Sequence, residues 1–543
     1  MIDWKNILLT GCAVFLLAAC SDDDDNGSAE QPVNPPAETE YVAPSYADDY
    51  GAISGWDKRA EWNLANVHDP SVEKCGDYYY MYGTDASYGN VHAGHGHFPV
   101  RRSKDLVNWE FHGMAMQQDR PLWVRDTINS LRAKAGLEPL IDDPRLNGLN
   151  LGYWAPVVRK MGNKYRMYYS IVVDHYIKTG VSTAVEHSFD NSWTEHALIG
   201  MMECDNLANN IWLDKGMVIH SATDKGTDWY RASLNSWGDA YFKWNAIDPS
   251  VIVTPEGEHW MIYGSWHSGI VAVKLNPETG KPDKLETLAD FGTRVARRVN
   301  NSAYRWQGQE APEVIYNPET GYYYLFLAYD ELSVAYNTRV CRSKSITGPY
   351  VGYDGKDIST GGDCWPILTH PYKFNNHPGW VGISHCCVFQ NPDTKEWYYS
   401  SQGRLPANTN GNEFSNAIMM GHVRSIKWTE DGWPVVMPER YAAVPQDEIT
   451  EADLVGSWEN IFLNYQFQVQ QASTILTLSA DKKASGAITG NWNYNAETST
   501  LTIGSYKLIV QRELDWEAEP RVPTIVYAGL TEKGISIWGK KEQ

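Results

Sequence analysis

Three carboxylic acids and one histidine stand at or next to the same position of a pattern that this chain repeats five times. Asp69 and Asp248 come directly before a proline, Glu310 stands one residue earlier in its own repeat, and His385 takes the aligned position of the fifth. Pairs of carboxylic acids perform general acid–base chemistry, in which one protonates a leaving oxygen and the other activates water. A third carboxylate can raise the pKa of the acid by like-charge repulsion. These groups are the ones that hydrolysis of a glycosidic bond requires.

Each repeat is a short apolar strand, a turn, and a second strand rich in aromatic residues. The repeats occupy residues 68–83, 154–169, 247–264, 310–326 and 384–399, and four of the five carry proline at the same place. Turns rich in Gly or Asn between the two strands indicate hairpins. A third strand recurs at Val100–Ser103 and Arg339–Ser343. Radially repeated four-stranded units predict an all-β fold with a five-bladed β-propeller, and irregular repeat spacing argues against a linear solenoid.

The inner strands of a propeller line one channel and begin at the same end of it. We therefore expect Asp69, Asp248, Glu310 and His385 to meet in one pocket, although they are far apart in the chain. An aspartate before a proline is also a common turn-capping residue, which is the alternative for any single one of these acids. Three acids at matching positions of a repeat favour a shared site.

The chain divides into four predicted segments. Residues 1–20 form a lipoprotein signal peptide, 21–46 an acidic, Pro-rich tether, 47–445 the propeller, and 446–543 a small antiparallel β-barrel of short alternating strands with polar turns. Between the first two repeats, Asp126–Ala135 has the pattern of a helix, with Gly136 just past its end. This helix could wall the mouth of the channel.

The first twenty residues predict the compartment. An apolar run over Ile7–Leu17 is too short to span a bilayer and ends in Leu17-Ala18-Ala19-Cys20, which resembles a bacterial lipobox. Cys20 would be lipidated and become the mature N-terminus, and the acidic run behind it resembles the export signal of some surface-exposed lipoproteins. We expect a protein anchored by lipid to the outer membrane and facing outward. Orientation toward the periplasm and plain secretion are the alternatives.

The amino-acid composition and net charge indicate which kinds of molecule the protein could bind. The 33 Tyr and 23 Trp far outnumber the 12 Phe, and amphipathic rings suit stacking on sugars, although Tyr and Trp are also good strand formers. A net charge of −21 argues against binding nucleic acid and favours a neutral substrate. We expect a monomer.

Five pieces of the chain, all close to these acids, carry a family resemblance. They are Val67-His68-Asp69-Pro70, Asn245-Ala246-Ile247-Asp248-Pro249, Tyr263-Gly264-Ser265-Trp266, Gln309-Glu310-Ala311-Pro312 and Tyr336-Asn337-Thr338-Arg339-Val340. With these motifs the chain resembles glycoside hydrolase family 43, and within it the endo-α-1,5-L-arabinanases that carry a C-terminal β-barrel accessory domain. Two stretches depart from the family pattern: the second repeat lacks the usual Asp after its Pro156, and the fifth has Cys386-Cys387 after its His385.

The resemblance implies an inverting hydrolase of arabinan or arabino-oligosaccharides that cuts within the chain. Asp69 would be the general base, Glu310 the general acid, and Asp248 the residue that raises the pKa of the acid and orients it. Two alternatives stay open within the family, an exo-acting α-L-arabinofuranosidase and a β-xylosidase. A third, from a different class, is a non-catalytic surface lipoprotein that binds glycans.

The remaining predicted site residues surround these acids. The resemblance places His385 beneath the active centre, near one calcium ion or its waters, although calcium prefers oxygen ligands. Trp154 and Trp266 are candidates for stacking on the sugar, with core packing as the alternative. Ser265, Asn337 and Asn245 are expected to contact the substrate.

Overall fold

The computed structural model describes residues 41–84, 95–117, 121–134, 139, 151–173, 196–222, 244–266, 269–298, 308–374, 377–417 and 419–543, together with the backbone of 181–182 and 187–188. The chain divides into one unit at 1–42 and another at 43–543. Every described helix and strand lies in the second unit. The predicted signal peptide, its Cys20 and most of the tether lie outside the described residues.

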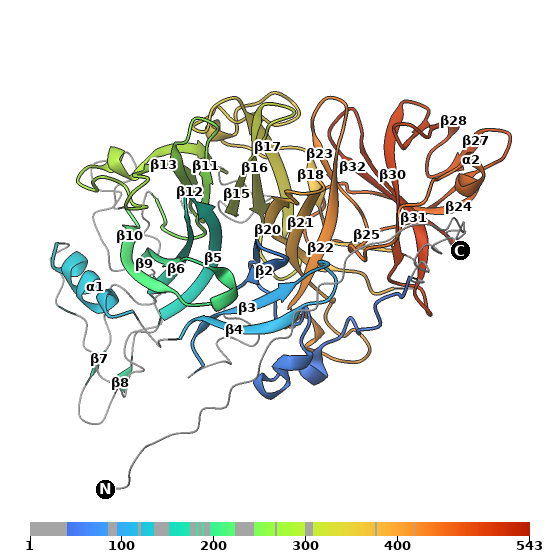
Figure 1. Cartoon of the computed structure of the whole chain (residues 1–543). Coiled ribbons are helices and arrows are strands. Elements are labelled where there is room, and N and C mark those ends of the chain that lie inside the picture. Colours follow the sequence, from blue (N-terminus) through green and yellow to red (C-terminus); the bar gives the residue numbers. More distant parts are fainter. Residues whose placement is uncertain are drawn as a thin grey trace, which may run out of the picture. The chain divides into compact units, whose positions relative to one another are not determined.

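Five four-stranded antiparallel sheets follow one another along the chain, as predicted (Figure 1). Their strands, given from the inner strand outward, are β1 (Ser71–Cys75), β2 (Tyr78–Tyr82), β3 (His97–Ser103) and β4 (Glu110–Met116); β5 (Leu151–Met161), β6 (Lys164–Val173), β9 (His196–Cys204) and β10 (Leu213–His220); β11 (Ser250–Val253), β12 (His259–Tyr263), β13 (Ile270–Leu275) and β14 (Thr293–Ala296); β15 (Gln309–Asn317), β16 (Tyr322–Tyr329), β17 (Asn337–Ser343) and β18 (Ile367–Thr369); and β20 (Val381–Gln390), β21 (Trp397–Arg404), β22 (Met419–Trp428) and β23 (Pro434–Val436). We number these sheets blades 1 to 5.

Hydrophobic clusters between successive blades close the ring. Separate clusters join blades 1 and 2, 2 and 3, 3 and 4, 4 and 5, and 5 and 1. Successive side chains of a strand point to opposite faces of its sheet. Tyr80 and Tyr82 accordingly pack against blade 2, whereas Tyr79 and Met81 pack against blade 5. The aromatic second strands therefore bury both faces, which explains their almost unbroken apolar character.

The segment before the first strand also ties the two ends of the propeller together. Ala65 forms a β-bridge with Met420 of β22, and the amide of Gly421 donates to the carbonyl of Leu64 at 2.8 Å. Blade 5 is thereby attached to the segment that leads into blade 1.

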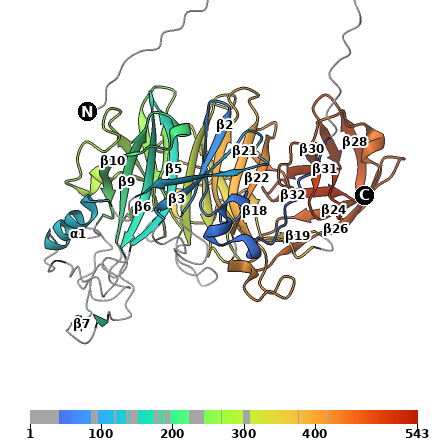
Figure 2. The same ribbon diagram turned by 60° about the horizontal axis from the view of Figure 1, so that its bottom comes forward.

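The C-terminal part is a closed antiparallel barrel, again as predicted. Its strands are β24 (Gly456–Phe462), β26 (Thr474–Leu478), β27 (Lys483–Gly486), β28 (Gly490–Asn495), β29 (Thr500–Ile503), β30 (Tyr506–Asp515), β31 (Val522–Leu530) and β32 (Ser536–Lys541). The short helix α2 (Glu451–Leu454) precedes it, with Thr450 and Asp453 forming a capping box. Two short strands join barrel and propeller, because β19 (Tyr372–Lys373) pairs in parallel with β25 (Gln471–Ala472). Figure 2 shows β19 beside the barrel strands.

The predicted helix exists but lies elsewhere than expected. Helix α1 spans Trp123–Lys134, so it begins three residues before Asp126, which occupies its first turn. Val124 and Ile128 are buried in the cluster between blades 1 and 2, and Trp123 Nε1 donates to Asp214 of β10 at 3.2 Å. Since β10 is the outermost strand of blade 2, α1 covers the rim of the propeller (Figure 1) and does not wall the channel mouth.

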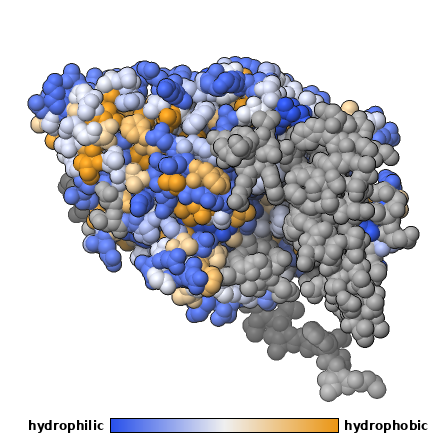
Figure 3. Space-filling model, turned by 180° about the vertical axis from the view of Figure 1, so that it is seen from behind, coloured by the Kyte–Doolittle hydropathy of each residue, from blue (hydrophilic) through white to orange (hydrophobic). Residues whose placement is uncertain are grey.

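The remaining elements are short. In the described part of the chain, the 3₁₀ helices are Gly51–Ile53, Trp56–Glu61, Leu207–Asn209, Leu288–Phe291, Ile358–Thr360 and Ser415–Ala417, and β7 (Val181–Ser182) pairs with β8 (His187–Ser188). On the face drawn in Figure 3, hydrophilic residues alternate with small hydrophobic patches. Among the described residues, no helix is both long and apolar enough to cross a membrane.

Candidate active site

The repeated position has the same unusual backbone in all five blades. Asp69, Ala155, Asp248, Ala311 and His385 have φ angles of 49°, 43°, 55°, 52° and 51°. Residues other than glycine rarely adopt this left-handed conformation, which costs about 1–3 kcal/mol and concentrates at functional sites. Inner strands β5, β15 and β20 shift register beside it, and such bulges redirect side chains. Each repeat therefore contains a bend in or just before its inner strand at this position, and the bend changes the direction of the side chain there.

A polar side chain near the end of the second strand supports this bend in four blades. Thr84 Oγ1 accepts the Ala155 amide at 2.6 Å, and Ser170 Oγ accepts the Asp248 amide at 3.0 Å. In the last blade, Gln402 Oε1 accepts a hydrogen bond from the Asp69 amide at 2.7 Å, which joins blade 5 to blade 1. Each of these bonds joins one blade to the next.

The fourth such contact reaches a carboxylate directly. Ser265, at the end of β12, donates through its hydroxyl to Glu310 Oε2 at 2.9 Å. The sequence carried a signal for this role, because Tyr82-Gly83-Thr84 and Tyr263-Gly264-Ser265 match in type and position.

Asp69 is held as a carboxylate. Its Oδ1 lies 2.9 Å from His385 Nδ1 and 3.3 Å from His68 Nε2, and its Oδ2 accepts the Thr84 hydroxyl at 2.6 Å. Burial by itself raises the pKa of Asp69, but the charges and hydrogen bonds of these neighbours outweigh it and hold the pKa well below its usual value. A carboxylate of this kind can accept a proton from water.

Glu310 has the opposite character. Tyr336 donates to its Oε1 at 2.6 Å, while Ser265 and Trp266 Nε1 donate to its Oε2 at 2.9 and 2.6 Å. Burial raises the pKa of Glu310, and although these donors and the charge of His385 oppose that effect, the pKa stays above its usual value. Glu310 is suited to donate a proton.

Asp248 interacts electrostatically with both of the other acids. It is 6% exposed, and its Oδ2 accepts the amide of Ala311, the residue after Glu310, at 3.1 Å. Burial is the main reason why the pKa of Asp248 lies well above its usual value, and repulsion from Glu310 and Asp69 adds to it while His385 opposes it. This contact with the residue after Glu310 suits an orienting role, while the predicted role of Asp248 in raising the pKa of Glu310 stays a prediction.

His385 supplies the positive charge of the cluster. Burial alone lowers the pKa of His385, but Asp69, Asp248 and Glu310 reverse the effect and raise the pKa to about 9. The four residues predicted to meet therefore interact as one group.

Of the residues predicted to contact the substrate, Ser265 and Trp266 donate to Glu310. Asn245 and Asn337 bond to other residues of the protein. Asn245 is 2% exposed, and its amide donates to the carbonyl of Ser265 at 3.3 Å. Asn337 is fully buried, donates to Asp330 Oδ2 at 2.9 Å and accepts from Arg339 Nε at 2.9 Å. Both asparagines therefore shape the protein around the site through contacts within the chain.

Trp154 is half-buried and packs against the cluster between blades 2 and 3, which matches the core-packing alternative for this residue.

Several contacts to the acids were missed in the sequence. Thr84 and His68 contact Asp69, and Tyr336 donates to Glu310, so each contacts a candidate catalytic carboxylate. Tyr336 lies within one of the family-like motifs, but no spacing rule links it to Glu310, since it comes from the turn between β16 and β17.

The predicted calcium ion at His385 stays a prediction. Calcium favours six to eight oxygen ligands, and the contact of His385 Nδ1 with Asp69 leaves Nε2 as the ring nitrogen that could face a metal. Among the described residues, the one group of three acidic, His or Cys ligand atoms within 4.8 Å of each other is Glu439, Asp515 and Glu517. Lys540 Nζ occupies that group, 2.8 Å from Asp515 and 2.5 Å from Glu517. Metal analysis of the purified protein is the direct measurement.

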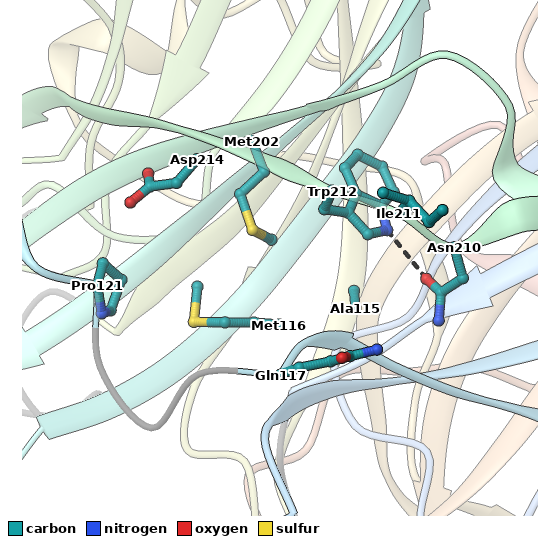
Figure 4. A pocket seen from close by; sticks show the side chains of 9 residues that line it. All are labelled: Ala115, Met116, Gln117, Pro121, Met202, Asn210, Ile211, Trp212 and Asp214. Carbon is teal, nitrogen blue, oxygen red and sulfur yellow. Dashed lines mark hydrogen bonds between the residues drawn. The ribbon is translucent and has the colours of Figure 1, made fainter. Parts of the chain in front are cut away.

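A separate cavity lies between blades 1 and 2 (Figure 4). It has a volume of about 220 Å³ and is lined by residues of β4, β9 and β10 and their flanks, among them Met116, Met202 and Trp212. Trp212 Nε1 donates to Asn210 at 3.0 Å at its edge. None of the catalytic candidates lines it.

Comparison with known proteins identifies the family. The model described as "Glycosyl hydrolases family 43" matches residues 64–434, and a "C-terminal lipocalin-like domain" matches 438–539. The chain is 25% identical over 523 residues to an extracellular endo-α-(1→5)-L-arabinanase of Thermotoga petrophila, covering 90% of this chain and 97% of that protein. It is 26% identical over 500 residues to extracellular endo-α-(1→5)-L-arabinanase 2 of Bacillus subtilis, covering 88% and 93%.

The fold agrees with these sequence matches. A crystal structure of the endo-1,5-α-L-arabinanase from Thermotoga petrophila superposes with a TM-score of 0.65 at 24% identity, covering 89% of this chain and 99% of that one. Asp69, Asp248, Glu310 and His385 all lie inside the matched propeller, and the family model spans well over half of the sequence. This chain is therefore a member of glycosyl hydrolases family 43.

Proposed function

We propose that the protein hydrolyses α-1,5-linked arabinan within the polysaccharide chain and inverts the anomeric centre. The acid–base assignment rests on the opposite pKa shifts of two carboxyl groups. The neighbours of Asp69 keep it ionised, whereas the pKa of Glu310 is raised. Groups driven apart in this way take the separate roles of base and acid. The substrate is inferred from the names of the two relatives that match most of this chain, both of which are endo-α-(1→5)-L-arabinanases.

The reaction follows from these protonation states. Glu310 gives its proton to the glycosidic oxygen as the bond from that oxygen to C1 breaks. A water molecule attacks C1 from the opposite face and passes a proton to Asp69. Burial keeps the pKa of Glu310 high, Asp248 holds the strand after Glu310 through the Ala311 amide, and His385 keeps Asp69 charged. Exchange of protons with solvent restores both groups.

The time course of products on linear arabinan tests this proposal. We expect a ladder of oligosaccharides at early times, and proton NMR should show the β-anomer as the first product released. Arabinose alone, or one oligomer of fixed length, would instead support the exo-acting alternatives. Initial release of the α-anomer would refute inversion, and no turnover on any glycan would favour the glycan-binding alternative.

We also propose that the mature protein acts outside the cytoplasm as a lipoprotein anchored through Cys20. The lipobox-like Leu17–Cys20 supports this location, and both relatives are named as extracellular. Labelled palmitate should be incorporated into the wild type, and a Cys20→Ser variant should lose both the label and the membrane fraction. Equal labelling of the two proteins would contradict the anchor.

A further inference from the structure

The C-terminal barrel contacts the propeller close to the general acid. Its segment 463–473 lies against the connection between blades 4 and 5, where β25 pairs with β19. The Gln471 amide donates to the Pro371 carbonyl at 2.8 Å, and the Gln466 amide donates to His370 Nε2 at 3.2 Å. Backbone bonds fix this segment, so its side chains are presented in a defined register.

Tyr465 of this segment contacts buried polar residues of blade 4. Its hydroxyl donates to Asp330 Oδ2 at 2.9 Å, and its ring lies 4.7 Å from the guanidinium carbon of Arg339. Asp330 is 4% exposed and has a left-handed φ of 70°. The same Oδ2 also accepts from Asn337 at 2.9 Å, and Oδ1 pairs with Arg298. Tyr465 is therefore one of three partners that hold a buried carboxylate.

Asp330 begins the turn whose far end touches the catalytic acid. This turn, residues 330–336, ends at Tyr336, which donates to Glu310 Oε1 at 2.6 Å. A second barrel side chain holds the same turn, since Gln468 Nε2 donates to Glu331 Oε1 at 3.2 Å. Glu331 in turn accepts the amides of Ser333 at 2.8 Å and Ala335 at 3.2 Å. The barrel thus contacts the first two residues of the turn, Asp330 and Glu331.

The backbone amide of Asp330 also contacts the chain just before Glu310. The Asp330 amide donates to the Gly308 carbonyl at 3.0 Å, and Arg298 donates to that carbonyl at 3.1 Å. Gly308 stands two residues before Glu310. Asp330 is therefore linked to Glu310 in two ways. The turn that it begins carries Tyr336, which donates to Glu310, and its amide binds the backbone two residues before Glu310.

We propose that Tyr465 of the C-terminal barrel is a positioning residue for the general acid, acting through Asp330 on the turn that brings Tyr336 to Glu310. The inference rests on the proposed role of Glu310 and assigns the barrel a part in catalysis. A positioned acid depends on supporting hydrogen bonds that lock its neighbours, and a small displacement reduces proton transfer. Loss of the Tyr465 hydroxyl should therefore weaken protonation of the leaving group and leave substrate affinity unchanged.

A leaving-group comparison tests this role. Tyr465→Phe keeps the ring over Arg339 and removes only the hydroxyl. We expect kcat on linear arabino-oligosaccharides to fall about 10- to 150-fold, the scale of one hydrogen bond to a charged group, with KM within about twofold of the wild type. On an aryl arabino-oligosaccharide whose phenolate leaves without protonation, kcat should change by less than about twofold. Tyr336→Phe, which touches Glu310 directly, should show the same pattern.

Two further variants separate positioning from general attachment of the barrel. Lys507→Gln removes another bond between barrel and propeller, the 2.6 Å pair with Glu430, which lies on the turn between β22 and β23. It should leave both activities unchanged. Gln468→Met removes the second contact to the turn and should lower kcat on the oligosaccharide alone, by less than Tyr465→Phe does. It also tests the inference independently if Tyr465→Phe lowers the melting temperature.

The outcomes separate this inference from the proposed function. A wild type without arabinan hydrolysis would refute the proposed function itself. If the wild type is active, equal losses on both substrates, a rise in KM with unchanged kcat, or no effect in both Tyr465→Phe and Gln468→Met would overturn the positioning role. A loss confined to kcat on the unactivated substrate would support it.

Discussion

Replacing Glu310 by glutamine should lower kcat on linear arabinan by about two to four orders of magnitude, the usual scale for loss of a general acid. Glutamine keeps the size of the side chain, and its single carbonyl oxygen can accept from Tyr336 or from Ser265, but it has no acidic proton to give to the leaving oxygen. Initial rates of reducing-sugar release measure the effect. Glu258→Gln, which changes a glutamate paired with Lys274 in blade 3, is the matched control and should match the wild type.

The leaving group and the pH profile identify the lost function as proton donation. On an aryl arabino-oligosaccharide with an acidic phenol, the Glu310→Gln variant should recover most of the wild-type rate, because that bond breaks without protonation. In the wild type, Glu310 must be protonated, so the rate falls as pH rises through its raised pKa. The variant should lack this decline. A variant equally slow on both substrates would contradict the assignment of Glu310 as acid.

Replacing Asp69 by asparagine should also lower kcat by about two to four orders of magnitude, but on both kinds of substrate. Asparagine fits the same space and can accept from Thr84, yet it cannot take a proton from water. Because the pKa of Asp69 is held well below its usual value, the wild-type base should stay ionised down to below about pH 4. Asp205→Asn, at an exposed pair with Lys164, is the control and should leave the rate unchanged.

Azide distinguishes a lost base from a damaged site. Azide attacks C1 without needing a base, so it should restore turnover of Asp69→Asn and give a glycosyl azide of inverted configuration. The C1–nitrogen bond then forms as the C1–oxygen bond breaks and Glu310 protonates the leaving oxygen. The Glu310→Gln variant should gain nothing from azide on arabinan. Wild-type rates in both variants would instead favour a glycan-binding protein.

The architecture was predictable because it is written in repeated local patterns. Each blade carries the same strand–turn–strand motif, and the aromatic run of Tyr78–Tyr82 is needed where a strand buries both faces between neighbouring blades. The barrel followed from short alternating strands with polar turns. The position of α1 was not predictable, since the pattern of a helix states which face is apolar and not which blade that face meets.

The site was predictable to the level of residue type and alignment. Asp69, Asp248, Glu310 and His385 were found because one repeated position recurs in the sequence, and the structure shows a left-handed backbone at that position in every blade. The contacts of Asn337 and Tyr336 were not predictable. Adjacent in sequence, they bond to Asp330 and Glu310 respectively, and only the path of the turn decides which of them reaches the acid.

The sequence by itself therefore determined the five blades, the barrel and the set of acids, because these depend on periodic patterns and on residue type. Only the tertiary structure decided what each acid does. Asp69 and Asp248 are the same residue at the same repeated position, yet the pKa of one is lowered and that of the other is raised. The reason is the neighbours that folding supplies: Asp69 meets His385 and the Thr84 hydroxyl, whereas Asp248 is buried facing two other carboxyl groups.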